Sequence, residues 1–122
     1  MSIEFSDKPS VLLFFTTWCP YCNDDAPKMV ELYNKYKDEV NVYGINVINR
    51  DVLSEVKQYV EHYQIEYPVL LDESNQLYEK YGEKGFPSMF FVDTNGKTKD
   101  RIIGSTDISV IEESFLGLIN SH

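Results

Sequence analysis

Apolar residues follow two spacings along the chain, and segments with one spacing alternate with segments that have the other. Residues 11–16 are almost continuously apolar, which is typical of a central strand buried on both faces. Apolar side chains then recur at intervals of about three or four residues, the spacing of an amphipathic helix. These helical positions are Ala26, Met29, Val30, Leu32, Tyr33 and Tyr36. An alternating pattern over residues 40–48 predicts a second strand.

The remainder of the chain continues this alternation. The predicted elements are a helix at 52–63, a strand at 68–71, a helix at 75–81, strands at 88–92 and 99–103, and a helix at 108–119. The dipeptide Asn95-Gly96 is typical of a hairpin turn, so the last two strands should pair antiparallel at one edge. The first two strands are joined by a crossover helix and should be parallel. We therefore expect an α/β fold with a mixed central β-sheet flanked by helices on both faces.

The size and charge of the chain narrow the classes of protein to consider. Its 122 residues, 43% of them hydrophobic, suit one domain spanning 1–122. Its 11 basic and 20 acidic residues give a net charge of -9, which repels phosphate backbones, so we expect no nucleic-acid partner. No segment is apolar over the roughly 18 residues of a membrane span. No long apolar edge strand is predicted, so we expect a monomer.

The two cysteines of the chain lie in Trp18-Cys19-Pro20-Tyr21-Cys22, between the first strand and the first helix. A strand, then Cys-x-x-Cys, then a helix is typical of thiol-disulfide redox proteins. The first thiol then lies at a helix N-terminus, where free N–H groups and the helix dipole stabilise a thiolate. We expect Cys19 to be the nucleophile and Cys22, one turn on, to be the resolving thiol. Pro20 suits the first helical turn, and Tyr21 places an aromatic face beside the sulfurs.

Two other uses of the cysteines are structural burial and zinc binding. A zinc site would need a second pair of ligands, and the histidines, His62 and His122, are too far apart in sequence to form one. The Cys-x-x-Cys spacing and the preceding Trp18 favour redox chemistry over simple burial. The sequence also contains no glycine-rich phosphate loop. We therefore expect no metal, flavin or nucleotide, and a redox-active disulfide between Cys19 and Cys22.

A peroxidase is a further alternative. The run Thr16-Thr17-Trp18-Cys19 contains Thr-x-x-Cys, the core of the peroxiredoxin motif. That motif also has a proline where this chain has Leu12, and an arginine beside the sulfur. Arg50 and Arg101 are present, but no pattern in the sequence places either of them there. Disulfide exchange is therefore the preferred hypothesis.

The segment Gly85-Phe86-Pro87 precedes the strand at 88–92. Alone, it is a proline at the start of a strand. Together with the cysteines it resembles the cis-proline loop of thioredoxin-like proteins, which packs against the cysteines. In those proteins the residue before the proline pairs with an incoming peptide as an added strand. The resemblance implies a cis bond at Pro87 and a substrate-binding surface made by Trp18, Pro20, Tyr21, Phe86 and Pro87.

Over nearly its whole length the chain resembles the thioredoxin superfamily, and within it the TlpA/ResA-like (redoxin, AhpC/TSA-type) thiol-disulfide oxidoreductases. Beyond the cysteine motif, the matching segments are Asp25-Ala26-Pro27, Gly44-Ile45-Asn46-Val47, 67–72, Phe86-Pro87-Ser88 and 91–97. The resemblance implies a thioredoxin fold in which about 52–71 form a helix-strand insertion after the second strand. Because the family is mostly extracytoplasmic, it also favours an extracytoplasmic domain, trimmed from a longer and possibly membrane-anchored bacterial protein, over a cytoplasmic one.

Acidic residues expected behind the motif are replaced in this chain. Thioredoxin has a buried acid where Leu13 stands, and the ResA-like branch has a glutamate after the second strand, at the position of Asn49. The group that takes the proton of Cys22 is therefore open: water, Asp24 and Asp25 are candidates. The role we predict for Asp24 and Asp25 is to cap the helix and interact with its dipole.

The expected function is thiol-disulfide exchange with partner proteins through the Cys-Pro-Tyr-Cys site, with the chain acting as a reductant. A disulfide-forming oxidase is the alternative within the class, because proteins of this fold span roughly -270 to -120 mV. A non-catalytic module that binds peptides around Trp18, Tyr21 and Phe86 is the alternative from another class. The implied partners are protein disulfides or dithiols and an upstream electron donor or acceptor protein.

Overall fold

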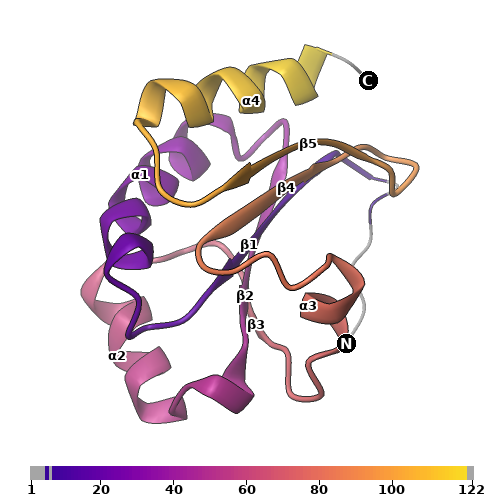
Figure 1. Ribbon diagram of the computed structural model, residues 1–122. Coiled ribbons are helices and arrows are strands. Elements are labelled where there is room, and N and C mark those ends of the chain that lie inside the picture. The colour runs from indigo at the N-terminus through magenta and orange to yellow at the C-terminus, as the bar shows by residue number, and fades with distance from the viewer. Residues whose placement is uncertain (1–4, 6, 121–122) are drawn as a thin grey trace.

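The computed structural model describes residue 5 and residues 7–120 of the chain. In chain order the elements are β1 (Ser10–Phe15), α1 (Pro20–Tyr36), β2 (Asn41–Asn46), a 3₁₀ helix (Ile48–Arg50), α2 (Leu53–His62), β3 (Val69–Leu71), α3 (Gln76–Lys80), β4 (Ser88–Val92), β5 (Thr98–Ile103) and α4 (Ile108–Asn120). The strands form one sheet in the order β3-β2-β1-β4-β5, with helices on both sides (Figure 1).

The strand pairing confirms the predicted mixed sheet. β1 pairs parallel with β2 and antiparallel with β4, β2 pairs parallel with β3, and β4 and β5 form an antiparallel hairpin at the edge. Every residue of β1 is buried, as its continuous apolar run predicts. β2 ends at Asn46, before the predicted end at residue 48, because the chain turns there into the 3₁₀ helix.

The side chains of β1 alternate between two apolar cores, one on each face of the sheet. One core holds the buried faces of α1 and α4, Tyr59 of α2, and these residues of β1: Val11, Leu13 and Phe15. The other core contains Leu12 and Phe14 of β1 together with Tyr78 of α3. α1 is therefore fixed against the sheet along its length. In the described ranges of the chain, no helix has the length and apolar character needed to cross a membrane.

The topology brings the two predicted site segments to the same end of the sheet. α1 begins at Pro20, a short loop after the end of β1 at Phe15. β4 runs antiparallel to β1, and Ser88 at its start pairs with Phe14. Residues 85–87, which lead into β4, therefore lie beside the loop that leads from β1 into α1.

Candidate active site

Cys19 is the N-cap residue of α1. Its backbone is extended (φ -79°, ψ 119°), and its Sγ accepts a hydrogen bond from the backbone N–H of Cys22 at 3.4 Å. Both cysteines are free thiols, and both are buried, with 5% of Cys19 and 2% of Cys22 exposed. The expectation that Asp24 and Asp25 cap this helix is wrong, because the sulfur of Cys19 fills that position.

The cis-proline loop lies directly against Cys19. The Phe86–Pro87 peptide bond is cis, as the resemblance implied. The Cys19 thiol donates to the Phe86 carbonyl oxygen at 3.6 Å, and the ring of Phe86 meets the ring of Trp18 edge-on at 6.0 Å. Trp18 and Tyr21 are each about 60% exposed, although both are large aromatic residues. The loop thus brings a backbone acceptor and an exposed aromatic ring to the cysteine that is nearer the surface.

The environment of Cys22 keeps its thiol neutral. Burial is the main cause that raises its pKa, far above the ordinary value for a cysteine. A backbone hydrogen bond from Thr16 acts in the opposite direction, whereas the side-chain hydrogen bond with Cys19 and the charges of Cys19 and Asp25 raise the pKa further. Cys22 can therefore attack a disulfide only if a base removes its proton as it reacts.

Asp25 is a fully buried carboxylate on the same face of α1 as Cys22. Its Oδ1 accepts from Lys28 Nζ at 3.0 Å and from Ser105 Oγ at 2.7 Å. Its Oδ2 is also buried, and it has no hydrogen-bond partner in the part of the chain that the structure describes. The sequence contained a signal for this placement, because Asp25 falls at the helical spacing of the buried residues Cys22, Ala26 and Met29.

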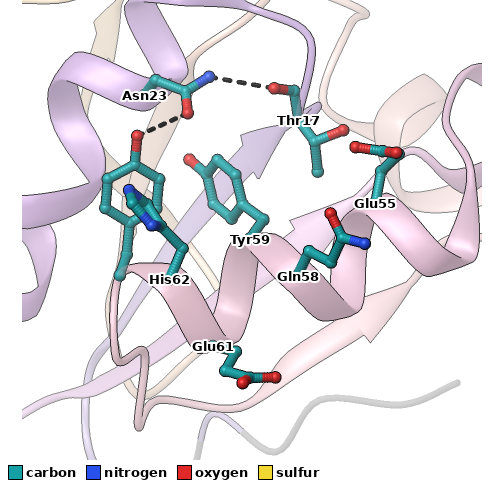
Figure 2. Close-up of a pocket in the computed structure, with 8 residues that line it drawn as sticks. Thr17, Asn23, Glu55, Gln58, Tyr59, Glu61 and His62 are labelled. Carbon is teal, nitrogen blue, oxygen red and sulfur yellow. Dashed lines mark hydrogen bonds between the residues drawn. The ribbon is translucent and has the colours of Figure 1, made fainter.

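A second cluster of hydrogen bonds holds the active-site turn to α2. Tyr59 Oη donates to the Cys22 carbonyl oxygen at 2.9 Å, and Tyr63 Oη donates to Asn23 Oδ1 at 2.6 Å. The amide of Asn23 in turn donates to the carbonyl oxygens of Thr17 and Cys19. Figure 2 shows Asn23 of α1 facing Tyr59 of α2 across a groove. The helical pattern at 52–63 includes Tyr59 and Tyr63 as apolar positions, but no pattern in the sequence assigned either of them, or Asn23, a role in the site.

The loop before Cys19 is fixed by Asp51, which follows the 3₁₀ helix. Its carboxylate accepts from the N–H of Thr17 at 2.7 Å, from Thr17 Oγ1 at 2.6 Å and from Asn46 Nδ2 at 3.0 Å. Burial by itself would raise the pKa of Asp51, but these hydrogen bonds and one from the N–H of Val52 outweigh it and lower the pKa. Asp51 is thus an acid near the position of Asn49, but it orders the loop and does not contact the sulfurs.

The two arginines and His62 do not form part of the site. The guanidinium group of Arg50 lies over the ring of Tyr78 and 3.4 Å from Glu83, and Arg101 is exposed on the edge strand β5. His62 is exposed at the end of α2. His122 lies outside the described residues. Within the described residues, no group of three or more His, Cys, Asp and Glu side chains is arranged to hold a metal ion.

A five-stranded mixed sheet with a Cys-x-x-Cys turn at the start of a helix and a cis-proline opposite it defines a thioredoxin-like protein. The family model described as "AhpC/TSA family" matches residues 2–101. The chain belongs to the AhpC/TSA family.

Relatives of similar sequence include ResA proteins, which agrees with the predicted resemblance to the TlpA/ResA-like branch. "Thiol-disulfide oxidoreductase ResA" of Bacillus thuringiensis subsp. konkukian is 32% identical over 111 residues, which cover 90% of this chain and 63% of that protein. ResA of Bacillus anthracis is 35% identical over 106 residues, which cover 84% of this chain and 60% of that protein. The chain therefore spans less than two thirds of the length of these relatives.

Solved structures confirm the predicted thioredoxin fold. A putative thiol:disulfide interchange protein DsbE from Chlorobium tepidum has a TM-score of 0.84 at 26% identity, covering 93% of this chain and 82% of that one. StoA from Bacillus subtilis has a TM-score of 0.83 at 23% identity, covering 94% of this chain and 87% of that one. Whether residues 52–71 are an insertion relative to thioredoxin stays a prediction, although a helix and a strand lie in that range.

Proposed function

We propose that the chain exchanges disulfides with partner proteins through Cys19 as the nucleophile and Cys22 as the resolving thiol. The observation that carries this proposal is the position of Cys19 Sγ, at the N-terminus of α1 and against the Phe86 carbonyl oxygen. The free N–H groups at a helix start favour a thiolate, which is the attacking species. The names of the ResA relatives and of the DsbE structure support the same reaction class.

The reaction proceeds in two exchange steps. In the first, the Cys19 thiolate bonds to one sulfur of the partner's disulfide, the partner's S–S bond breaks, and its other sulfur leaves as a thiolate. In the second, Cys22 bonds to Cys19 Sγ and expels the partner's remaining sulfur as a thiolate. We assign the proton of Cys22 to Asp25, since that carboxylate is buried on the same helix face and has one unpartnered oxygen. Two electrons pass from the dithiol to the partner.

The partner peptide would lie along the cis-proline loop. The backbone of Phe86 is the edge to which an extended peptide adds as a strand. The exposed rings of Trp18 and Tyr21, the neighbours of the Cys19-Pro20 pair in the sequence, provide apolar contact area. Together with Pro20 and Pro87, these residues form the substrate-binding surface of the proposal.

The direction we propose is reduction of the partner. The disulfide of such a pair is a strong oxidant when the reduced form of the pair is stabilised as a thiolate. Here burial, with the charge of Asp25, keeps Cys22 a neutral thiol, so the reduced form gains no stabilisation from a thiolate at Cys22. The electron donor that restores the dithiol would be another protein or a small thiol.

Reduction of insulin separates the enzyme from a peptide-binding module. The wild-type chain, kept reduced by a small dithiol, should accelerate insulin reduction, whereas Cys19→Ser should give the uncatalysed rate. Cys22→Ser should accumulate a mixed disulfide between Cys19 and the partner that is visible on a non-reducing gel. Equal and negligible rates for wild type and Cys19→Ser would leave the peptide-binding module as the better account.

A further inference from the structure

Lys28 reaches the buried carboxylate of Asp25 from one turn further along α1. Its Nζ donates to Asp25 Oδ1 at 3.0 Å and to the Thr106 carbonyl oxygen at 2.7 Å. Ser105, in the loop between β5 and α4, donates to the same Oδ1 at 2.7 Å. The side chain of Asp25 is 1% exposed and that of Lys28 is 27% exposed. A cation with access to water is thus paired with an anion that has none.

The two donors leave the carboxylate asymmetric. Both hydrogen bonds go to Oδ1, while the buried Oδ2 has no partner among the described residues. An unpartnered carboxylate oxygen in the interior is costly, so it indicates a use outside the resting structure. Cys22 lies one turn before Asp25 on the same buried face, and its thiol carries a proton that must leave.

Lys28 places a positive charge beside Asp25. Burial favours the neutral carboxylic acid, which cannot act as a base, and a nearby cation favours the carboxylate. Two other titratable groups lie near Cys22: Cys19 acts on its thiol, and the phenol of Tyr59 donates to its carbonyl oxygen. Neither of these groups supplies a positive charge, whereas Lys28 does.

We propose that Lys28, assisted by Ser105, is a positioning residue for the resolving step. It engages Oδ1 of Asp25 and leaves Oδ2 without a partner among the described residues, on the buried helix face that Asp25 shares with Cys22. In that step the Cys22–Cys19 bond forms, the bond from Cys19 to the partner's sulfur breaks, and the proton of Cys22 passes to Asp25 while the partner leaves as a thiolate. This inference rests on the proposed roles of Cys22 and Asp25.

Stopped-flow reaction of the reduced protein with 5,5′-dithiobis(2-nitrobenzoate) separates the two steps. Attack by Cys19 releases a first equivalent of the coloured thiolate, and resolution by Cys22 releases the second. We expect Lys28→Met to move the midpoint of the second phase upward by about one pH unit, and so to slow it roughly tenfold on the acid limb. The first phase should be unchanged.

Three variants serve as comparisons. Lys28→Arg retains the charge and should keep a midpoint close to that of wild type. Ser105→Ala should move the midpoint in the same direction as Lys28→Met but less far. Lys35→Met removes another lysine of α1, which pairs with Glu112 at 2.6 Å, and should leave both phases unchanged. Far-ultraviolet circular dichroism establishes that each variant is folded.

Specific results would overturn the inference. If the pH profile of Lys28→Met coincides with that of wild type, Lys28 only ties α1 to the loop at Thr106. If Lys28→Met produces the same shift in an Asp25→Asn background, it acts on another group. Failure of the proposed function would be visible in wild type alone, as the absence of a second equivalent of coloured thiolate. That result would overturn the function and this inference together.

Discussion

Cys19 and Cys22 differ in chemistry because they differ in position by one helical turn. The sulfur of Cys19 caps α1 and meets the loop at Phe86, whereas Cys22 lies deeper, where burial raises its pKa. The spacing of the two cysteines predicted these separate roles. It did not predict the buried state of Asp25, because a charged residue near a helix start is more often a solvent-exposed cap. Only its place in the buried spacing of α1 could have indicated it.

Asp51 provides a residue-scale prediction of stability against pH. Its pKa is lowered in the folded state, so it stabilises the fold above its unfolded pKa of about 3.9, and this stability is lost as the pH falls further. Asp51→Asn should lower the free energy of unfolding by about 1–2 kcal/mol at neutral pH, because charge-assisted hydrogen bonds to Thr17 are weakened. Urea unfolding measures this free energy at neutral pH and at the lowest pH at which the protein is still folded.

The control for Asp51 is Asp38→Asn, at an exposed position after α1. We expect the urea midpoint of this variant to match that of wild type at both pH values. The difference between Asp51→Asn and wild type should shrink as the pH falls below the unfolded pKa of about 3.9 toward the lowered pKa of the folded state, because the folded protein then begins to bind the proton. A difference that is equal at both pH values would mean that the charge of Asp51 does not hold the loop.

At the scale of elements, the predicted strands and helices are found in the structure, including the short β3 and α3, whereas the 3₁₀ helix was not predicted. β1 and α1 were predicted because a continuous run and a sustained helical spacing leave few alternatives. Only Ile48, the first residue of the 3₁₀ helix, was predicted as the end of a strand, and the helix itself was not predicted, since three residues are too few to show a period. That helix matters for the site, because the Arg50 carbonyl oxygen accepts from Trp18 Nε1 at 2.7 Å and Asp51 follows directly.

The short helix α3 holds the cis-proline loop in place through Tyr78. The ring of Tyr78 stacks on Phe86 with centroids 4.9 Å apart, and its Oη accepts from the N–H of Gly85 at 2.8 Å. Tyr78→Phe removes the hydrogen bond but keeps the ring, so the loop should be less well held. We expect KM for a peptide disulfide to rise by roughly two- to tenfold, which corresponds to one hydrogen bond.

The measurement is the steady-state rate as a function of the concentration of a peptide disulfide. The small disulfide 5,5′-dithiobis(2-nitrobenzoate) serves as a second substrate. The small substrate does not need the Phe86 backbone, so its rate with Tyr78→Phe should equal that of wild type. Tyr81→Phe removes the hydroxyl group of a ring that packs against Phe14 and Phe90, and should leave the rates with both substrates unchanged. Equal losses with both substrates would show that Tyr78 acts on the cysteines rather than on peptide docking.

At the scale of the whole molecule, the direction of electron flow depends on the charges and the burial around the two sulfurs. The net charge of the chain is -9, and burial, with a smaller contribution from the charge of Asp25 in α1, opposes a thiolate at Cys22. The sequence correctly predicted the sheet, the thioredoxin fold and the cis bond at Pro87. It left the direction of electron flow open, because that depends on which charges are buried beside the sulfurs, and a one-dimensional pattern does not show this.

The equilibrium reduction potential of the Cys19–Cys22 pair against a glutathione buffer tests this account most directly. Because the surroundings of Cys22 disfavour a thiolate, we predict a value below about -220 mV, toward the thioredoxin end of the range. A value of about -120 mV would contradict the proposal that the chain reduces its partners, and would support a disulfide-forming oxidase. Failure of the pair to form a reversible disulfide would contradict thiol-disulfide exchange itself.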